Sequence, residues 1–257
     1  MIVKTEAVVL KSMRYRETSK IVTFYTKAFG KLSGIAKGAR ALKNKFGAAL
    51  EPMTYVSLVL YKKEHRELQL ISQCDIVKLF PRLQSDLEKI SVGLVVVELI
   101  NAAMHSEERN EQGFHLVVEV LDELDRATKN FQNVLYYFRL HLLDLMGFRP
   151  NFQTCARCKK RLFQDLSDDT EVHFEPKSGG FLCNACSRQY ARKMRLQFRS
   201  VRFLRDLLQI PLSKVTTVGV PEVSKKEIEE ALGLYERFHL VGVEKLKTPG
   251  VVKSLAV

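Results

Sequence analysis

Residues 53–62 read Met-Thr-Tyr-Val-Ser-Leu-Val-Leu-Tyr-Lys, and they carry the clearest β-strand pattern in the chain. The side chains alternate between two sets, Tyr55, Ser57, Val59 and Tyr61 against Val56, Leu58, Leu60 and Lys62. Because successive residues of a strand face opposite sides of a sheet, this alternation predicts a strand with one buried face.

Similar short runs of β-branched and aromatic residues occupy the first 80 residues, separated by glycine or charged residues. They predict five strands, at residues 2–10, 18–26, 32–38, 53–62 and 67–76. Gly30-Lys31 is a plausible tight turn between the second and third strands. Five short strands without a long crossover helix favour a small closed barrel of the OB type, with an SH3-like barrel as the alternative.

The periodicity becomes helical after Phe80-Pro81 and predicts helices over residues 86–104, 111–127 and 131–146. We expect Ser85 to cap the first of these helices, and Gly147 and Pro150 to end the third. The third helix is apolar on nearly all sides, so we expect it at the centre of a helical domain.

Two C-x-x-C pairs, Cys155-Ala156-Arg157-Cys158 and Cys183-Asn184-Ala185-Cys186, are separated by 24 residues. Such pairs typically form two tight turns that together offer four thiolates to one tetrahedral zinc ion. The intervening Glu175-Pro176-Lys177-Ser178-Gly179-Gly180-Phe181 suggests a hairpin that leads into the second pair. The alternatives are two disulfides or a redox-active pair, and we interpret the lone Cys74 as a buried core residue.

A site with four thiolate ligands has no open position for substrate, which favours a structural metal and a protein that is not an enzyme. His65-Arg66-Glu67 resembles the H-x-E element of zinc deaminases, but that signature requires proline where Thr154 precedes Cys155. The chain also lacks a phosphate-binding loop, a G-x-S-x-G elbow and an H-E-x-x-H motif.

The formal net charge of +12 is unevenly distributed along the 257 residues. Residues 1–80 carry +9, residues 81–150 carry −4 and residues 151–257 carry +7. Two basic ends around an acidic middle favour a polyanionic partner such as nucleic acid, with solubility alone as the alternative explanation. The sequence contains neither a secretory signal pattern nor an apolar run that could span a bilayer, so we expect a cytoplasmic protein without membrane contact.

The densest basic stretch, residues 37–45, holds four cations and no acid. We predict DNA-phosphate contacts from these cations and from two arginines near the first turn, namely Lys37, Arg40, Lys43, Lys45, Arg14 and Arg16. A plain solvated loop is the alternative. A second basic run after the cysteines, from Arg188 to Arg205, should be broken into two pieces because Ser200 resembles a new helix cap.

Several of these segments, in this order, resemble the RecO family of bacterial recombination mediators over most of the chain. The N-terminal likeness rests on Ala7-Val8-Val9-Leu10-Lys11, Tyr15-Arg16-Glu17, Ile21-Val22, Thr26, Gly30-Lys31 and Ala36-Lys37-Gly38-Ala39-Arg40. The C-terminal likeness rests on Gly147-Phe148-Arg149-Pro150, the cysteine pairs, Gly179-Gly180-Phe181-Leu182-Cys183, Tyr235, His239-Leu240 and Lys253-Ser254-Leu255. One departure is Lys159, since the family often has glycine after the second cysteine.

The resemblance implies an α+β multidomain protein: a five-stranded OB-fold DNA-binding domain over residues 1–80, then an all-α domain over residues 81–257. The latter would be interrupted by a zinc-ribbon-like insertion at residues 151–190, with one structural Zn²⁺ on Cys155, Cys158, Cys183 and Cys186. It also implies binding to single- and double-stranded DNA, strand annealing, and action with RecR to load RecA onto DNA coated by single-strand-binding protein. In the family, the C-terminal tail of that coating protein docks on the helical domain. The alternative is a zinc-ribbon accessory factor of transcription or translation that binds RNA or a polymerase.

Overall fold

The computed structural model describes residues 1–162, 166–189, 193–243 and 246. The chain divides into two compact units, one formed by Met1–Ala127 and the other by Thr128–Glu244. We call them the barrel unit and the C-terminal unit. Lys253-Ser254-Leu255, part of the family resemblance, lies outside the described residues.

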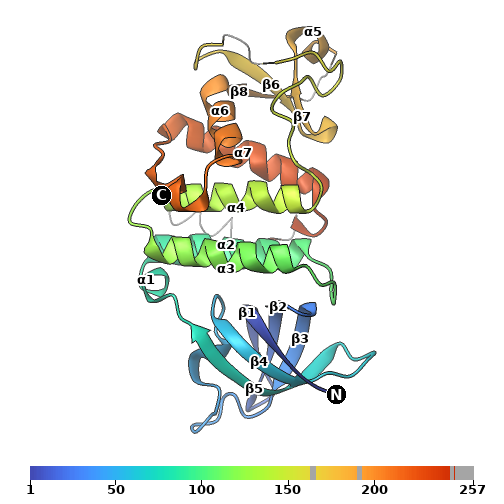
Figure 1. Cartoon of the computed structure of the whole chain (residues 1–257), viewed down its shortest axis with the longest axis vertical. Helices are drawn as coiled ribbons and strands as arrows, with labels where there is room; N and C mark the ends of the chain where they lie inside the picture. The colour runs from blue at the N-terminus through green and yellow to red at the C-terminus, as the bar shows by residue number, and fades with distance from the viewer. Residues whose placement is uncertain (163–165, 190–192, 244–245, 247–257) are drawn as a thin grey trace. The chain divides into compact units, whose positions relative to one another are not determined.

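The barrel unit begins with five strands that close on themselves in the order β1-β2-β3-β5-β4 (Figure 1). The strands are β1 (Ile2–Tyr15), β2 (Ser19–Thr26), β3 (Gly30–Ala36), β4 (Tyr55–Tyr61) and β5 (Leu68–Lys78). All neighbouring pairs are antiparallel except β3 and β5, which run parallel. A closed five-stranded Greek-key barrel is the OB arrangement, so the prediction of an OB-type fold is confirmed.

The first strand is longer than predicted, because it continues past Leu10 to Tyr15. Its N-terminal part pairs with β4, its C-terminal part pairs with β2, and the register with β2 shifts between Val9 and Lys11. A bulge of this kind bends a strand and increases its twist. One strand can therefore take part in both sides of the barrel closure.

The barrel core follows the alternation seen in the sequence. Val56, Leu58 and Leu60 of β4 are fully buried, whereas the intervening side chains are partly or fully exposed. Cys74 lies in the same core and is 3% exposed, as predicted for a buried hydrophobic residue. Burial raises the pKa of its thiol to about 12, so this cysteine is inert at neutral pH.

Three helices complete the barrel unit: α1 (Pro81–Gln84), α2 (Leu87–Ala103) and α3 (Glu111–Arg126). The predicted cap at Ser85 is wrong, because Asp86 is the N-cap of α2. Its carboxylate accepts hydrogen bonds from the amides of Glu88 and Lys89, at 2.9 and 3.1 Å. The Ser85 hydroxyl instead donates to the Arg82 carbonyl and closes the preceding turn.

The C-terminal unit combines helices with a small sheet of order β7-β6-β8. Its strands are β6 (Glu171–Glu175), β7 (Gly180–Leu182) and β8 (Met194–Gln197). Its helices are α4 (Phe131–Leu145), α5 (Asn184–Ser187), α6 (Phe198–Leu207) and α7 (Glu222–His239). This unit also contains two short 3-10 helices, η2 (Pro176–Ser178) and η3 (Leu212–Thr217). The barrel unit contains a third, η1 (Gly47–Leu50).

Helix α4 is largely buried, as its apolar sequence predicts. It also carries a buried ion pair, in which Arg139 donates to Glu236 of α7 at 2.7 and 2.9 Å and to Glu229 at 2.8 Å. A buried guanidinium needs such partners, because an unpaired buried charge is strongly destabilising. This bidentate contact fixes α7 against α4. Within the described residues, no helix has the length and apolar character needed to cross a membrane.

Gly30 lies close to the backbone of the segment that connects α2 and α3 within the barrel unit. It has a φ of +63°, and a Cβ at this position would overlap the Glu108 carbonyl. We expect Gly30→Ala to lower the free energy of unfolding of the barrel unit by at least about 2 kcal/mol, because strain and overlap add. Gly47→Ala is the matched control, since Gly47 has a φ of +52° but open space around its Cβ. Denaturant titration should give a clearly smaller loss for the control, and equal losses would contradict the close contact.

Candidate metal centre and basic surfaces

The two cysteine pairs meet in the C-terminal unit. Cys155 and Cys158 lie in the loop before β6, Cys183 follows β7 directly and Cys186 lies in α5. Their four sulfur atoms lie within 4.8 Å of one another, and the Sγ atoms of Cys158 and Cys183 are 3.7 Å apart. A tetrahedral site with Zn–S bonds of about 2.3 Å places its sulfurs about 3.8 Å apart. This arrangement can hold a metal ion, and all four thiols are free rather than in disulfides.

The predicted hairpin between the cysteine pairs is present and brings them together. Strands β6 and β7 are antiparallel, and the turn between them is capped by the Glu175 carboxylate, which accepts from the amides of Lys177 and Ser178. Beyond the turn, the amide of Ala156 donates to the Phe181 carbonyl at 2.8 Å. That bond attaches the first cysteine loop to the strand that leads into the second.

The backbone around the sulfurs favours thiolate ligands. The Cys183 amide donates to the Cys155 sulfur at 3.4 Å. Burial raises the pKa of the Cys155 thiol, but hydrogen bonds from the amides of Cys158, Cys183 and Arg157 outweigh burial and lower the pKa to about 6. Such amide donation is a common feature of sulfur atoms that bind metal, because it stabilises the anionic form.

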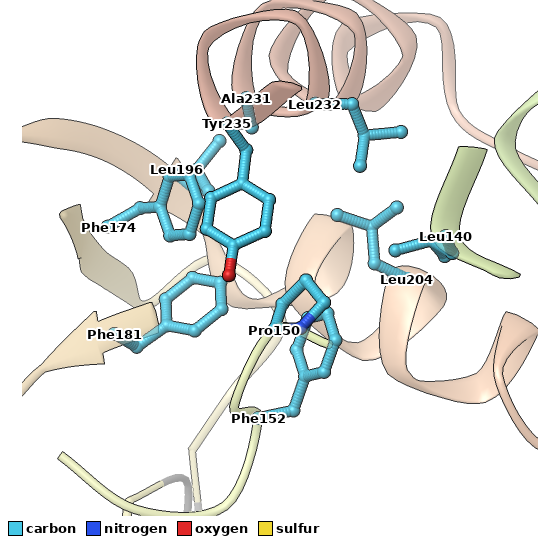
Figure 2. Close-up of a pocket in the computed structure, with 10 residues that line it drawn as sticks. All are labelled: Leu140, Pro150, Phe152, Phe174, Phe181, Leu196, Leu204, Ala231, Leu232 and Tyr235. Atoms are coloured by element: carbon cyan, nitrogen blue, oxygen red, sulfur yellow. The ribbon is translucent and has the colours of Figure 1, made fainter. Parts of the chain in front are cut away.

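The small sheet next to the cysteines is anchored to the helices by an aromatic cluster (Figure 2). Phe174, Phe181 and Tyr235 converge on one apolar pocket, with the Phe174 ring 5.0 Å from that of Phe181 and 5.6 Å from that of Tyr235. The pocket is lined by Leu140, Pro150, Phe152, Phe174, Phe181, Leu196, Leu204, Ala231, Leu232 and Tyr235. These side chains come from the sheet, from α4, α6 and α7, and from the loop after α4, so the hydrophobic packing fixes the sheet on its own unit.

A metal held by these four cysteines would have a closed coordination shell, because four thiolate ligands complete a tetrahedron. In the described part of the chain, no other group of three or more histidine, cysteine or acidic side chains is placed to hold a metal. His65 and Glu67, which resemble part of a deaminase signature, lie in the turn between β4 and β5 and do not belong to the cysteine cluster.

The predicted basic loop connects β3 to η1 in the barrel unit, and its four cations are exposed. Arg40 donates to the carbonyls of Arg16 and Glu17 at 3.2 and 3.0 Å, which places this loop beside the β1–β2 turn. At its other end, Lys45 donates to the Ser72 carbonyl of β5 at 2.5 Å. Two of its cations therefore also fix the course of the loop.

The two arginines predicted to join this loop differ in position. Arg16 lies in the β1–β2 turn with a φ of +52°, but Arg14 belongs to β1 and pairs with Lys20 of β2. Both side chains are exposed, and neither forms an ion pair with a described carboxylate; the same holds for Lys37, Arg40, Lys43 and Lys45. The structure thus brings Arg16 and Arg40 together and leaves six cations without an acidic partner among the described residues.

Several aromatic residues of the barrel are buried and are therefore not available to stack on bases. Phe24 and Tyr25 are fully buried, and the Tyr25 hydroxyl donates to the Asn110 carbonyl. Tyr61, in contrast, is 42% exposed on β4. The sequence does not separate these two groups, because the alternation in β2 is less regular than that in β4.

The second basic run is broken into pieces as predicted, but for a different reason. Strand β8 separates α5 from α6, and Ser200 lies inside α6 with its hydroxyl bound to Glu227, so the prediction of Ser200 as a cap is wrong. Most arginines of this run are paired with acids. The pairs are Arg195 with Glu171, Arg199 with Asp169, Arg202 with Asp168 and Arg205 with Asp206. Arg192 lies outside the described residues.

Further cations near the metal centre were not predicted from the sequence to act together, although Arg188 begins the second basic run. Lys159, Lys160 and Arg161 follow the second cysteine and are exposed, as is Arg188 beyond the fourth. The sequence feature that could have identified this group of cations is the absence of any acidic residue from Cys155 to Arg161 and from Cys183 to Gln189.

Comparison with known proteins places both units in one family. Residues 1–80 match the family described as Recombination protein O N terminal, and residues 84–248 match Recombination protein O C terminal. The chain is 33% identical to the DNA repair protein RecO of Chloroherpeton thalassium, over 99% of both chains. It is 32% identical to the protein of the same name from Pelodictyon phaeoclathratiforme, again over 99% of both. The corresponding protein of Salinibacter ruber is 45% identical over 58% of this chain and 57% of its own length.

Lys159 has a φ of +61°, a conformation that glycine adopts without strain. The Lys159 amide donates to the Cys155 carbonyl at 3.0 Å, so this conformation closes the first cysteine turn. We expect Lys159→Gly to stabilise the C-terminal unit by up to about 1 kcal/mol, because it relieves the left-handed strain. Lys160→Gly is the control, since Lys160 has no positive φ and should gain nothing. Thermal denaturation compares the two variants, and a lower melting temperature for Lys159→Gly would contradict this account.

Proposed function

Because this chain belongs to the recombination protein O family, RecO, we propose that it is a non-catalytic DNA-binding mediator of DNA repair and recombination. The observation that carries the proposal is the group of six exposed cations on the barrel, which lack acidic partners among the described residues. Unpaired cations on a barrel surface suit the phosphate backbone of DNA, because each contact releases condensed counterions.

The proposed DNA contacts are Arg14, Arg16, Lys37, Arg40, Lys43 and Lys45. They extend from the end of β1, across the β1–β2 turn, to the loop that leaves β3. Such contacts carry no sequence information, so binding to both single and double strands follows from them. Neutralising the phosphates of two complementary strands also reduces their mutual repulsion, and this is the physical basis that we propose for strand annealing.

We propose that the four cysteines hold one structural Zn²⁺. The sulfur separation and the amide bonds to Cys155 support this metal, because zinc prefers four thiolates in a tetrahedron. The bound ion would join the two cysteine turns and so stabilise the sheet that they adjoin. A complete thiolate shell leaves no position for a reacting water, which supports a role without catalysis.

The partners proposed from family membership are RecR, the C-terminal tail of single-strand-binding protein and, indirectly, RecA. In this proposal the chain binds DNA coated with single-strand-binding protein and, together with RecR, promotes RecA loading. It would act in the cytoplasm at the nucleoid. The domain assignment of residues 1–80 to the OB fold, and 81–257 to the helical domain with its zinc segment at 151–190, belongs to the same proposal.

The zinc assignment is tested by elemental analysis of purified protein. We expect one zinc ion per chain, and loss of the metal with cooperative unfolding of the C-terminal unit in Cys155→Ser or Cys183→Ser. Zinc contributes about 10–16 kcal/mol in small zinc-binding peptides, so its loss should dominate the stability of this unit. Cys74→Ala is the control, because Cys74 lies in the barrel core and should leave the metal in place. A metal content near zero in the parent protein would refute the assignment.

The basic loop is tested with Lys37→Ala/Lys43→Ala, which leaves the hydrogen bonds of Arg40 and Lys45 intact. Affinity for single-stranded DNA should fall for all sequences, and the slope of log affinity against log salt should flatten by about 0.7 for each phosphate that the variant no longer neutralises. The control, Lys177→Ala/Lys214→Ala, removes the same charge from exposed positions in the other unit. Equal salt slopes in both variants would show that the loop is only a solvated connection. A marked preference for RNA over DNA would favour the accessory-factor alternative.

A further inference from the structure

The two cysteine turns carry a concentrated positive charge. Residues 155–161 and 183–189 together contain five cations and no acidic residue. Lys159, Lys160, Arg161 and Arg188 are exposed, and none of them forms an ion pair with a carboxylate of the described residues. We call these four residues the knuckle cations.

The cysteine cluster places the knuckle cations on adjoining segments. The Sγ atoms of Cys158 and Cys183 are 3.7 Å apart, and the Arg157 guanidinium contacts the Gln189 side chain, next to Arg188. The backbone beneath the first three cations is fixed, because the Cys155 amide donates to the Lys160 carbonyl at 2.8 Å. The charges therefore project from a rigid support, which lowers the entropy cost of binding a ligand.

The neighbouring arginines of β8 and α6, in contrast to the knuckle cations, form ion pairs with carboxylates. Arg202 is 2.8 Å from Asp168, and Arg195 is 3.6 Å from Glu171. An arginine already paired with a carboxylate must give up that partner before it binds a phosphate. The charge available to a polyanion in this unit is therefore concentrated at the cysteine turns rather than along the basic run that follows them.

The character of this surface favours nucleic acid over an acidic peptide. No large hydrophobic side chain is exposed in the described residues of either cysteine turn. Peptide recognition usually depends on buried aromatic or aliphatic anchors, whereas a phosphate backbone requires only cations and hydrogen-bond donors.

We propose that the knuckle cations form a second phosphate-binding surface, which holds a nucleic-acid strand independently of the barrel. This inference rests on the proposed function and adds to it a site for the second strand of an annealing pair. The closed thiolate centre then has a role in binding, because it holds in place the backbone from which the cations project.

The test compares the parent protein with the knuckle variant Lys159→Ala/Lys160→Ala/Arg161→Ala/Arg188→Ala. The matched control is Lys129→Ala/Lys177→Ala/Lys214→Ala/Lys226→Ala, which removes four exposed cations from the same unit. Zinc content, affinity for a labelled single strand at several salt concentrations, and the annealing rate of two complementary strands are measured for all three proteins.

We expect the knuckle variant to keep its zinc and to anneal about tenfold more slowly, with a salt slope flatter by about 2 to 3 than that of the parent. The control should resemble the parent. If the parent anneals and the knuckle variant behaves like the control, the second surface is refuted while the proposed function stands. If the parent neither binds nor anneals DNA, the proposed function itself fails. Unchanged DNA binding with loss of binding to an acidic peptide would also overturn the proposal.

A second measurement covers the case in which the knuckle variant loses zinc or unfolds. The parent is photo-crosslinked to a single strand containing a photoreactive thymine analogue, and the attached peptides are identified by mass spectrometry. We expect crosslinks in residues 156–162 and 184–189 as well as in the barrel loop. Crosslinks confined to the barrel unit would overturn the proposal.

Discussion

The close approach of four cysteine sulfur atoms is the constraint around which the small sheet of the C-terminal unit is organised. Four sulfur atoms within 4.8 Å of one another cannot all be ionised without a cation between them, because like charges at this distance repel strongly. The sulfur cluster brings together two segments that are separated by 24 residues in the sequence. The hairpin of β6 and β7 brings the segments together, and the cluster of Phe174, Phe181 and Tyr235 attaches the hairpin to α7. The buried pair of Arg139 and Glu236 then joins α7 to α4.

The basic surfaces of this protein differ less in the number of their cations than in whether those cations are already paired with carboxylates. The run from Arg188 to Arg205 is rich in arginine, yet most of its described members are already bound to aspartate or glutamate. The loop from Lys37 to Lys45 and the segment after Cys158 have fewer cations but lack such partners among the described residues. Since an exposed ion pair contributes little to stability, the paired arginines mainly lower the positive potential of their surface.

Much of the fold could be predicted because its determinants are local. The alternation in β4, the apolar character of α4 and the spacing of the cysteines each lie within one short segment. The misassigned caps have a different origin: Asp86 stands beside an equally suitable Ser85, and only the backbone geometry decides between them. The ion pairs of the second basic run could not be predicted, since Asp168 and Arg202 are 34 residues apart. The exposure of the cations after Cys158 likewise depends on tertiary structure, although their lack of neighbouring acids is visible in the sequence.

The closed barrel limits how another protein can bind to this unit. Every barrel strand has a hydrogen-bonded neighbour on both sides over part of its length, although β3 and β5 pair over only three residues, so closure shortens the strand edge that could template the addition of a foreign strand. The outer strands of the small sheet, β7 and β8, have only three and four residues and offer little length for such pairing. Edge-to-edge pairing between copies of the chain is therefore disfavoured, and the barrel presents its side chains more than its backbone to other molecules.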